Sequence, residues 1–423
     1  MRSPLPKLLL LPLVAASSFA ASTLPSPAGE MLLPSSPHPD ANATSAMVAS
    51  TPQKHDHPLG YFTFDSINTT ITLGGRAQLN VIYDRGQIAT PNDFVTAAIV
   101  TGNDPDSPID DRRTSVLMNS TRLIGTSHTD FGNKNAFLTY ASADFQGESR
   151  SRSPNIRLRQ LYGEFQSPFL GGSLRVGQAW TIFTDATTWP DTLDLEGPGS
   201  SLQLRRPLVC YYHDLADHLQ LLFALEQRNN QDFDEAFSTS RWPDGVLATV
   251  YDDGTNRIKA AAIFRDLRAE NERRQSDRTL GWGLNATGRV TADFLPEGDL
   301  FTFGAAGGAG IGSIYDDSPP DGVFNSATGT LEALPVFGYY IGYQHFWTPK
   351  WSSTASYGAL RVDNESTQTF DAFYKTKYFS ANIIWTPWDH VLIGVEFLRG
   401  QRQDKNRIDG TDSRIQFTTR YYF

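Results

Sequence analysis

The chain has 423 residues and a formal net charge of −10, and aromatic residues make up 12% of it although hydrophobic residues in total reach only 39%. A soluble chain of this length would ordinarily divide into two or three domains with helical segments, yet almost no stretch has the 3.6-residue period of an amphipathic helix. The single cysteine, Cys210, excludes an internal disulfide framework, and no stretch after the N-terminal apolar run reaches the roughly eighteen apolar residues of a transmembrane helix.

Residues 1–20 have the three parts of a secretory signal peptide. "MRSPLPK" carries two positive charges, "LLLLPLVAASSFA" is apolar, and small residues surround Ala20. The run is too short, and too rich in proline, for a membrane anchor. Cleavage after Ala20 would remove Arg2 and Lys7 and change the net charge from −10 to about −12.

Residues 21–60 form a Pro/Ser/Ala-rich leader with few aromatic residues and no period. We expect it to be disordered, because such a composition buries too little apolar surface to offset the entropy lost on ordering. His55 and His57 lie close together in it, but two histidines in a flexible leader do not make a metal site. We expect neither a metal nor a cofactor.

From residue 61 onward, the sequence alternates between apolar and polar residues, which is the period of β-strands. In the first such strand Leu73, Leu79 and Val81 share one face, and Arg76 and Asn80 share the other. The final strand repeats the pattern. It places Ile415, Phe417, Tyr421 and Phe423 opposite Arg414, Gln416, Thr418 and Arg420.

Short turns and long connections alternate strictly between these strands. The short ones are 130–134, 167–172, 214–217, 252–256, 295–299, 348–350 and 386–389, and the long ones are 86–113, 148–154, 185–204, 229–242, 269–278, 315–333, 364–370 and 402–412. Fifteen connections join sixteen strands. An even strand number with this rhythm predicts an all-β fold over 61–423: a sixteen-stranded antiparallel transmembrane barrel with short periplasmic turns and long extracellular loops.

If such a barrel closes, its first and last strands pair, and the C-terminal stretch "SRIQFTTRYYF" is then the strand that pairs with the first one. Aromatic residues beside the short turns fit the headgroup level of a membrane, with aromatic capping of soluble hairpins as the alternative. They are Phe165, Phe169, Tyr211, Tyr212, Phe346, Trp347, Trp351, Trp385, Trp388, Tyr421, Tyr422 and Phe423. An aromatic ending on an amphipathic strand also resembles the signal read by the barrel-assembly machinery, a partner during biogenesis.

Residues 176–212 combine a strand, an acidic loop and a basic return. The loop carries Asp185, Asp191, Asp194 and Glu196, and the chain returns through Arg205 and Arg206. Upstream, "NIRLRQLYGEF" places Arg157 and Arg159 on one strand face, which we expect to be the lumen because an arginine facing lipid at mid-depth costs about 2–4 kcal/mol. Leu161 and Phe165 share the parity of these arginines, so we expect a bulge near Gly163 to reset the phase.

"RLRQLYGEF", "GQAWTIFTDATTWPDTLDLEGPG", the "RRP" return and "GWGLNATGRV" (281–290) together resemble the DcaP-like outer-membrane porin family over most of 61–423. The resemblance implies a homotrimer of sixteen-stranded barrels in the outer membrane that passes small anionic solutes, dicarboxylates in particular. It also implies that the loop 185–204 folds inward as the pore constriction. The Pro-rich leader departs from the helical N-terminus of some family members.

Passage of anions requires fixed positive charge along a narrow, water-filled lumen. Our pore-lining and solute-binding candidates are Arg157, Arg159, Arg175, Arg205 and Arg206, with Arg76, Lys375 and Lys377 as weaker additions. The acidic residues of the loop, facing these, would create a transverse field. For each arginine alone, a structural salt bridge is the competing interpretation.

Residues 304–313 and 268–278 could also suggest binding sites. "GAAGGAGIGS" (304–313) lacks the lysine of a phosphate loop, and its small residues favour close approach of subunits or of a folded-in loop. The charged run 268–278 is either a solvated loop or a contact for lipopolysaccharide phosphates. A barrel enzyme such as a phospholipase and a secreted β-rich adhesion protein are the alternatives, but we identify no catalytic residues and expect no nucleic-acid partner.

Overall fold

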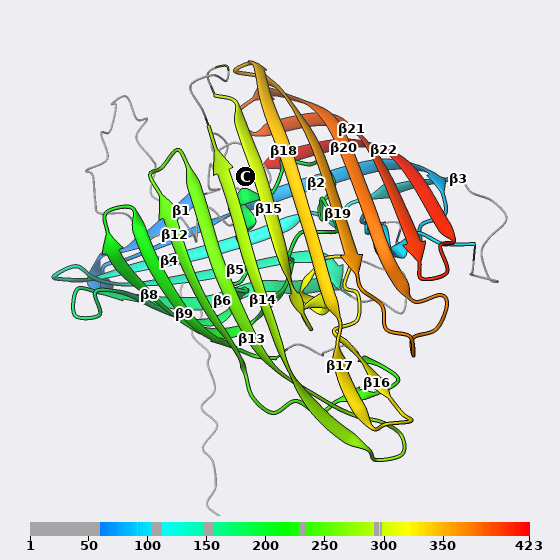
Figure 1. Cartoon of the computed structure of the whole chain (residues 1–423). Coiled ribbons are helices and arrows are strands. Elements are labelled where there is room, and N and C mark those ends of the chain that lie inside the picture. The colour runs from blue at the N-terminus through cyan, green and yellow to red at the C-terminus, as the bar shows by residue number, and fades with distance from the viewer. Residues whose placement is uncertain are drawn as a thin grey trace, which may run out of the picture. The chain divides into compact units, whose positions relative to one another are not determined.

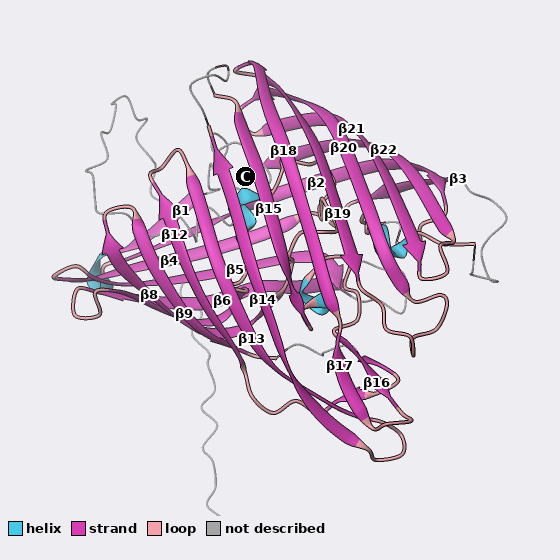
Figure 2. Ribbon diagram, viewed as in Figure 1, coloured by secondary structure: helices cyan, strands magenta, loops and turns pink. Residues whose placement is uncertain are grey.

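The computed structural model describes residues 60–90, 92–102, 112–147, 155–228, 233–291, 296 and 298–423. The predicted signal peptide (1–20) and all of the predicted leader (21–60) except Gly60 lie outside this range. The described chain is almost entirely strand, with four 3-10 turns: η1 (Asp65–Ile67), η2 (Thr96–Ala98), η3 (Ala186–Thr188) and η4 (Gly312–Ile314) (Figure 2). None of its helices has the length and apolar character needed to cross a bilayer.

Sixteen antiparallel positions form one closed barrel wall (Figure 1). In order they are β2 (Thr69–Gly86), β3 (Arg112–Leu117) together with β4 (Arg122–Gly132), β5 (Asn135–Gly147), β6 (Asn155–Ser167), β7 (Gly172–Trp180), β8 (Arg205–Ala216), β9 (Leu219–Glu226), β12 (Asp244–Asp252), β13 (Arg257–Glu270), β14 (Ser276–Val290), β15 (Leu300–Ala309), β18 (Pro335–Thr348), β19 (Trp351–Val362), β20 (Phe373–Trp388), β21 (Val391–Asp404) and β22 (Asp409–Tyr422). β3 and β4 share a position because both pair with β2. The predicted fold class and strand number are confirmed.

The barrel closes between β2 and β22. Their register runs from Arg76 opposite Tyr422 to Gly86 opposite Asp412, and Phe423 exchanges backbone hydrogen bonds of 2.9 and 3.1 Å with Gly75. The predicted pairing of the first and last strands is therefore confirmed. A short strand that the sequence did not predict, β1 (Gly60–Phe64), pairs with the beginning of β2. Its run of five residues is too short to reveal a period.

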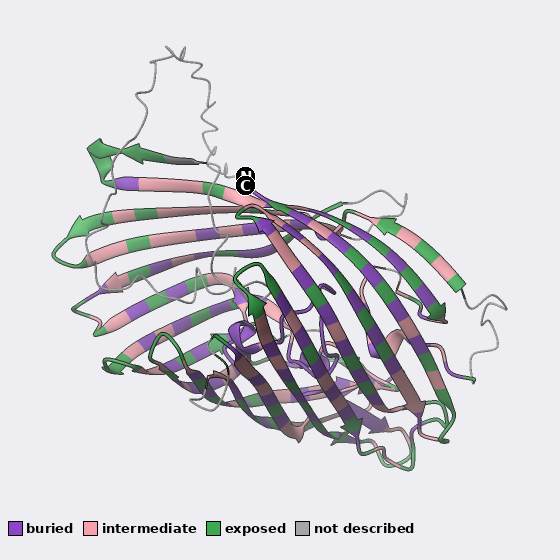
Figure 3. Ribbon diagram, turned by 90° about the horizontal axis from the view of Figure 1, so that it is seen from above, coloured by how far each residue is buried: buried purple, intermediate pink, exposed green. Residues whose placement is uncertain are grey.

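Burial alternates along the wall with period two (Figure 3). On β2, Leu79 and Val81 are exposed while Gln78 and Asn80 are buried. β22 has the predicted phase too, since Ile415, Phe417 and Tyr421 are exposed and Arg414, Gln416, Thr418 and Arg420 are buried. Apolar residues thus face outward and polar residues inward, as a lipid-embedded barrel requires. Among the predicted girdle aromatics, Tyr212 and Tyr422 are exceptions because both are buried.

A bulge in β6 resets the strand phase, but not at the predicted position. Ser142 of β5 lies opposite Gln160 and Ala143 lies opposite Leu158, so Arg159 is the additional residue. Gly163 is paired regularly with Thr139. The bulge brings two consecutive polar residues, Arg159 and Gln160, to the inside, and both are buried.

The long connections carry further small elements. β10 (Phe233–Asp234), β16 (Gly322–Asn325) and β17 (Thr330–Ala333) form a three-stranded sheet, and β11 (Phe237–Ser238) pairs with the end of β13. Phe233, Phe324 and Leu331 pack with Leu267 of β13 in a separate apolar cluster. These elements lie at the end of the barrel that carries the long connections, which is the extracellular end in barrels of this kind.

Candidate functional site: the loop 181–204 and the charges around it

The connection between β7 and β8, residues 181–204, lies inside the barrel. The carbonyl oxygens of Phe183 and Thr184 accept hydrogen bonds from Asn285 of β14 and Lys259 of β13, both of 2.7 Å. Farther along, Asp191 accepts a 3.2 Å hydrogen bond from Gln344 of β18. The loop therefore crosses from β7 to the strands on the far side of the wall and returns to β8.

Glycines of the wall make room for this loop. A Cβ atom at Gly342 would lie 2.9 Å from Pro190, one at Gly358 would lie 2.9 Å from Pro198, and one at Gly394 would lie 2.7 Å from Leu193. Side chains are excluded from these three positions because the loop occupies their space. The segment "GAAGGAGIGS" differs, because a Cβ atom at Gly304 would clash with the ring of Tyr340, a residue of the wall itself. Gly304 and Ala306 line a small cavity together with Thr184 and Trp189 of the loop.

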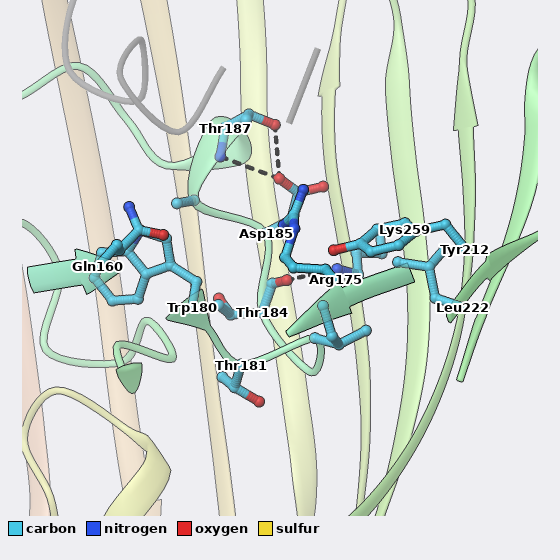
Figure 4. A pocket seen from close by; sticks show the side chains of 12 residues that line it. Gln160, Arg175, Trp180, Thr181, Thr184, Asp185, Thr187, Tyr212, Leu222 and Lys259 are labelled. Carbon is cyan, nitrogen blue, oxygen red and sulfur yellow. Dashed lines mark hydrogen bonds between the residues drawn. The ribbon is translucent and has the colours of Figure 1, made fainter. Parts of the chain in front are cut away.

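The beginning of the loop encloses a cavity of about 50 Å³ against the wall (Figure 4). Arg175 and Lys259 contribute positive charge to its lining, and Asp185 contributes negative charge. Arg175 is held between the rings of Tyr162 and Tyr212, at 4.4 and 4.8 Å, and its guanidinium bonds Glu164 at 2.7–2.8 Å. This predicted pore residue is thus fixed beneath the loop by its own partners.

Six inward-facing arginines come from consecutive parts of the wall, and we call them the arginine wall. They are Arg420 on β22, Arg76 on β2, Arg122 on β4, Arg157 and Arg159 on β6, and Arg205 on β8. Arg76 lies directly opposite Arg122 across the strand pair, and the guanidinium groups of Arg122, Arg159 and Arg205 repel one another. The structure therefore gathers three of the five main predicted candidates, Arg157, Arg159 and Arg205. It adds the more weakly predicted Arg76 but not Arg175 or Arg206.

The inward-facing arginines differ in whether a carboxylate of the protein already neutralises their charge. Arg157 and Arg159 both pair with Asp144, at 2.7 and 2.6 Å, and Arg157 keeps a side-chain exposure of 33%. Arg206 is 3% exposed and pairs with Glu226 and Asp244, so it is a buried structural cation rather than a lumen residue.

Arg122 and Arg205 form no ion pair among the described residues. The Arg205 guanidinium lies 4.6 Å from the centroid of the Trp180 ring. Two buried nitrogens, Nε of Arg122 and Nη1 of Arg205, have no hydrogen-bond partner within the described chain. These two side chains have the most donor capacity left for a bound anion.

Carboxylates on three loops face the arginine wall, and we call them the acidic cluster: Asp93, Asp194, Glu196 and Asp316. Glu196 attracts both Arg157 and Arg205, and Asp93 attracts Arg157. Burial raises the pKa of Asp93 and of Asp316 well above the usual range, and the neighbouring carboxylates raise it further. Glu196 and Asp93 therefore connect the acidic cluster with the arginine wall, and Asp316 neighbours the other carboxylates.

The four acidic residues predicted in the loop have different partners. Among the described residues, Glu196 forms no ion pair with the wall, whereas Asp194 lies 3.8 Å from Arg414 of β22. Burial opposes the ionisation of Asp185, but Arg257 at 2.8 Å and Lys259 outweigh it and lower its pKa to about 2. Burial raises the pKa of Asp191 to about 7. Asp194 accepts hydrogen bonds from the backbone amides of Glu196 and Gly197, at 3.3 and 3.1 Å, and so shapes the loop.

A comparison of the sequence with protein-family models identifies the family of this chain. Residues 71–423 match the model described as the DcaP outer membrane protein. The chain belongs to the DcaP outer-membrane protein family. It is accordingly a protein of the outer membrane. No curated protein sequence matches it.

Solved structures share the fold of this DcaP-family protein. The outer membrane channel DcaP of Acinetobacter baumannii aligns with a TM-score of 0.75 at 18% identity, over 86% of this chain and 100% of that one. An anion-selective porin from Comamonas acidovorans (TM-score 0.55, 11% identity, 84% and 100% coverage) and OmpF of Salmonella typhi (0.55, 12%, 86% and 100%) are also similar. At these identities the likeness establishes the sixteen-stranded porin fold.

Two of the predicted pore residues of this DcaP-family protein are not in the lumen. Lys375 and Lys377 share strand parity with Phe379 and Ile383, which are 40% and 46% exposed on the outer face. The inward residues of β20 are Thr376 and its even-numbered successors. The prediction failed because it assigned both lysines to the lumen from charge alone, without following the strand parity through to the apolar outer face.

Two members of the arginine wall, Arg122 and Arg420, were not among the predicted site residues. Arg420 was placed on the polar face of its strand, so its parity carried the necessary signal. Arg122 begins β4 directly after the interruption at 118–121, where there is no preceding strand from which to count. Among the described residues, no group of His, Cys, Asp and Glu side chains is arranged to hold a metal ion.

Proposed function

We propose that this DcaP-family protein is a passive diffusion channel for small hydrophilic anions, dicarboxylates in particular, and that the arginine wall selects them. The observation that carries the proposal is the placement of six arginines opposite the acidic cluster. The name of the similar porin from Comamonas acidovorans, "anion-selective", is in keeping with it.

The physical argument rests on fixed charge in a narrow space. Walls of low dielectric constant focus the field of lumen charges, so a row of guanidinium groups raises the local concentration of anions. A guanidinium also matches a carboxylate with two parallel hydrogen bonds. Two such groups, Arg122 and Arg205, would let one solute with two carboxylates be held at both ends.

The acidic cluster would contribute to the selection of solutes together with the arginine wall. A transverse field between it and the arginine wall would orient a solute that carries separated charges and would disfavour cations on the arginine side. Arg157, the most exposed of the paired arginines, would then meet the solute first. We also propose, from the family resemblance, that the channel is a homotrimer, which cross-linking of the detergent-purified protein followed by denaturing electrophoresis tests.

The test of selectivity is the reversal potential in planar bilayers under a salt gradient, with the wild type and the double variant Arg122→Gln plus Arg205→Gln. We expect anion preference in the wild type, a several-fold lower anion-to-cation permeability ratio in the variant, and weaker block by added dicarboxylates. The matched control, Arg273→Gln plus Arg274→Gln, removes the same charge from the exposed connection between β13 and β14 and should leave the ratio unchanged.

Cation preference of the wild type would contradict the anion channel. An unchanged ratio in the Arg122 and Arg205 variant would remove the arginine wall from the explanation. Heat-modifiable migration on gels establishes beforehand that each variant forms the barrel.

A further inference from the structure

A group of cations faces away from the lumen on the outer wall, near the extracellular end of the barrel. We call it the outer basic patch; it consists of Arg361 on β19, Lys375 and Lys377 on β20, Arg399 on β21, and Arg407 in the connection to β22. Arg361 lies directly opposite Lys375 in the strand pairing. Arg399 lies opposite Phe379, one outward position below Lys377.

Three of these cations surround one aromatic ring. Arg407, Arg361 and Lys375 lie 4.1, 5.5 and 5.5 Å from the centroid of Tyr374. A ring face attracts cations, but each added cation repels the others. The arrangement therefore leaves excess positive charge that a bound anion would neutralise.

Protein carboxylates do little to neutralise the patch. Among the described residues, the only ion pair that it forms is the 2.8 Å contact of Arg361 with Asp363, and both of these side chains are 61% exposed. Within the described part of the chain, the other four members, Lys375, Lys377, Arg399 and Arg407, form no ion pair. This is a local excess of positive charge in a chain whose net charge is −10.

The height of the patch on the barrel matches the outer headgroup layer. On β20, Lys375 precedes Trp385 by ten residues on the same outward face, and Trp385 stacks on Trp351 at 5.6 Å near the periplasmic turns. Ten strand residues extend about 33 Å, which at a tilt of about 40° rises about 25 Å, the height of the apolar band of such barrels. Phe379 and Ile383 fill the band between. The lysines thus lie where the band ends.

We propose that the outer basic patch binds the phosphate groups of lipopolysaccharide in the outer leaflet. The patch faces lipid rather than the lumen, it stands at the level of the headgroups, and its charge complements phosphate. Guanidinium and ammonium groups together suit a ligand with several phosphate oxygens. The exposed rings of Phe379 and Phe397 directly below would contact the acyl chains.

The test is native mass spectrometry of the detergent-purified full chain with lipid A that carries both phosphates. Lys375→Gln plus Lys377→Gln should weaken binding about 30-fold, because each juxtamembrane cation contributes about a fivefold attraction. Lys375→Arg plus Lys377→Arg should restore it. The matched charge-removal variant Arg273→Gln plus Arg274→Gln, in the charged run 268–278, should bind as the wild type does.

Three results would overturn the proposal. Equal binding by the wild type and the Lys375 and Lys377 glutamine variant would show that the patch is not the site. Equal binding of lipid A stripped of its phosphates would show that acyl chains alone are recognised. Binding of phosphatidylglycerol as tight as that of lipid A, and equally sensitive to the glutamine variant, would assign the patch to anionic phospholipid instead.

Discussion

The carboxylate of Glu396, on β21, accepts a hydrogen bond of 2.9 Å from the backbone amide of Leu193 in the folded-in loop. The same oxygen accepts the next amide, that of Asp194, at 2.8 Å, and Asn382 donates to the other oxygen at 3.3 Å. Glu396 is fully buried. One wall residue thus fixes the middle of the loop that crosses the lumen.

We predict that Glu396→Ala loosens this loop. The change leaves the amides of Leu193 and Asp194 without their acceptor, at a cost of about 1–3 kcal/mol for each buried unpaired group. Single-channel recordings should therefore show larger open-channel current fluctuations than the wild type. Gln401→Ala, on the outer face of the same strand, is the control and should not change the current noise. If the Glu396→Ala channel shows the same current fluctuations as the wild type, other contacts suffice to hold the loop.

The glycines beneath the loop lead to a second prediction, in which an added side chain displaces the loop instead of loosening it. Gly342→Ala places a methyl group 2.9 Å from Pro190 and 2.6 Å from Thr302 Oγ1, so the loop must shift toward the lumen. Overpacking of this size costs about 1–3 kcal/mol, and we expect a lower single-channel conductance. Gly245→Ala is the matched control, because its Cβ would have nothing within 4 Å and the conductance should stay the same. Equal conductance in both variants would show that the loop does not limit the current.

Adjacent arginines in β8 should behave differently when each is changed to glutamine. Arg206→Gln removes the 2.6 Å ion-pair partner of the buried Glu226 and leaves Asp244 with Arg265 alone, at 3.1 Å. We therefore expect a loss of about 3–5 kcal/mol in the free energy of unfolding. Arg205→Gln removes a cation with no ion pair in the described chain, so it should reduce anion preference with little loss of stability. Urea-induced unfolding and reversal potentials measure the two effects. If Arg205→Gln is the more destabilising change, the assignment of roles is wrong.

Much of the fold was predictable from the sequence because a lipid-embedded strand must alternate strictly and a barrel must close. The phases of β2 and β22, their pairing and the sequence of short and long connections all followed from that constraint. β1 was missed because it has five residues, and the bulge was misplaced because any residue between Arg157 and Phe165 could reset the parity. The β10–β16–β17 sheet joins segments about ninety residues apart through two- and four-residue strands, which carry no period of their own.

The site was less predictable than the fold because charge alone does not reveal a side chain's partner. Arg175 and Arg206 were predicted as pore residues, but both are buried against carboxylates that lie on neighbouring strands. Lys375 and Lys377 were assigned to the wrong face. Strand parity and register, rather than composition, separate a lumen cation from a structural or outward one.

The acidic cluster makes the selectivity depend on pH, and the sign follows from the raised pKa values of Asp93 and Asp316. A carboxyl with a raised pKa stays protonated and neutral to a higher pH than an ordinary aspartate, and becomes negative as the pH rises through that value. Guanidinium groups keep their positive charge to a much higher pH than carboxyl groups lose theirs. Raising the pH therefore adds negative charge opposite a constant positive wall, and the preference for anions should fall.

Reversal potentials measured at about pH 5 and about pH 9 test this expectation, as both values lie above the ordinary aspartate pKa of about 3.9. The wild type should lose anion preference over that interval. Asp93→Asn plus Asp316→Asn fixes both groups in a neutral form and should flatten the response while keeping high anion preference at the upper pH. A response of the same size in this variant would assign the titration to other groups, and a rise in anion preference with pH would contradict the placement of the acidic cluster in the conducting space.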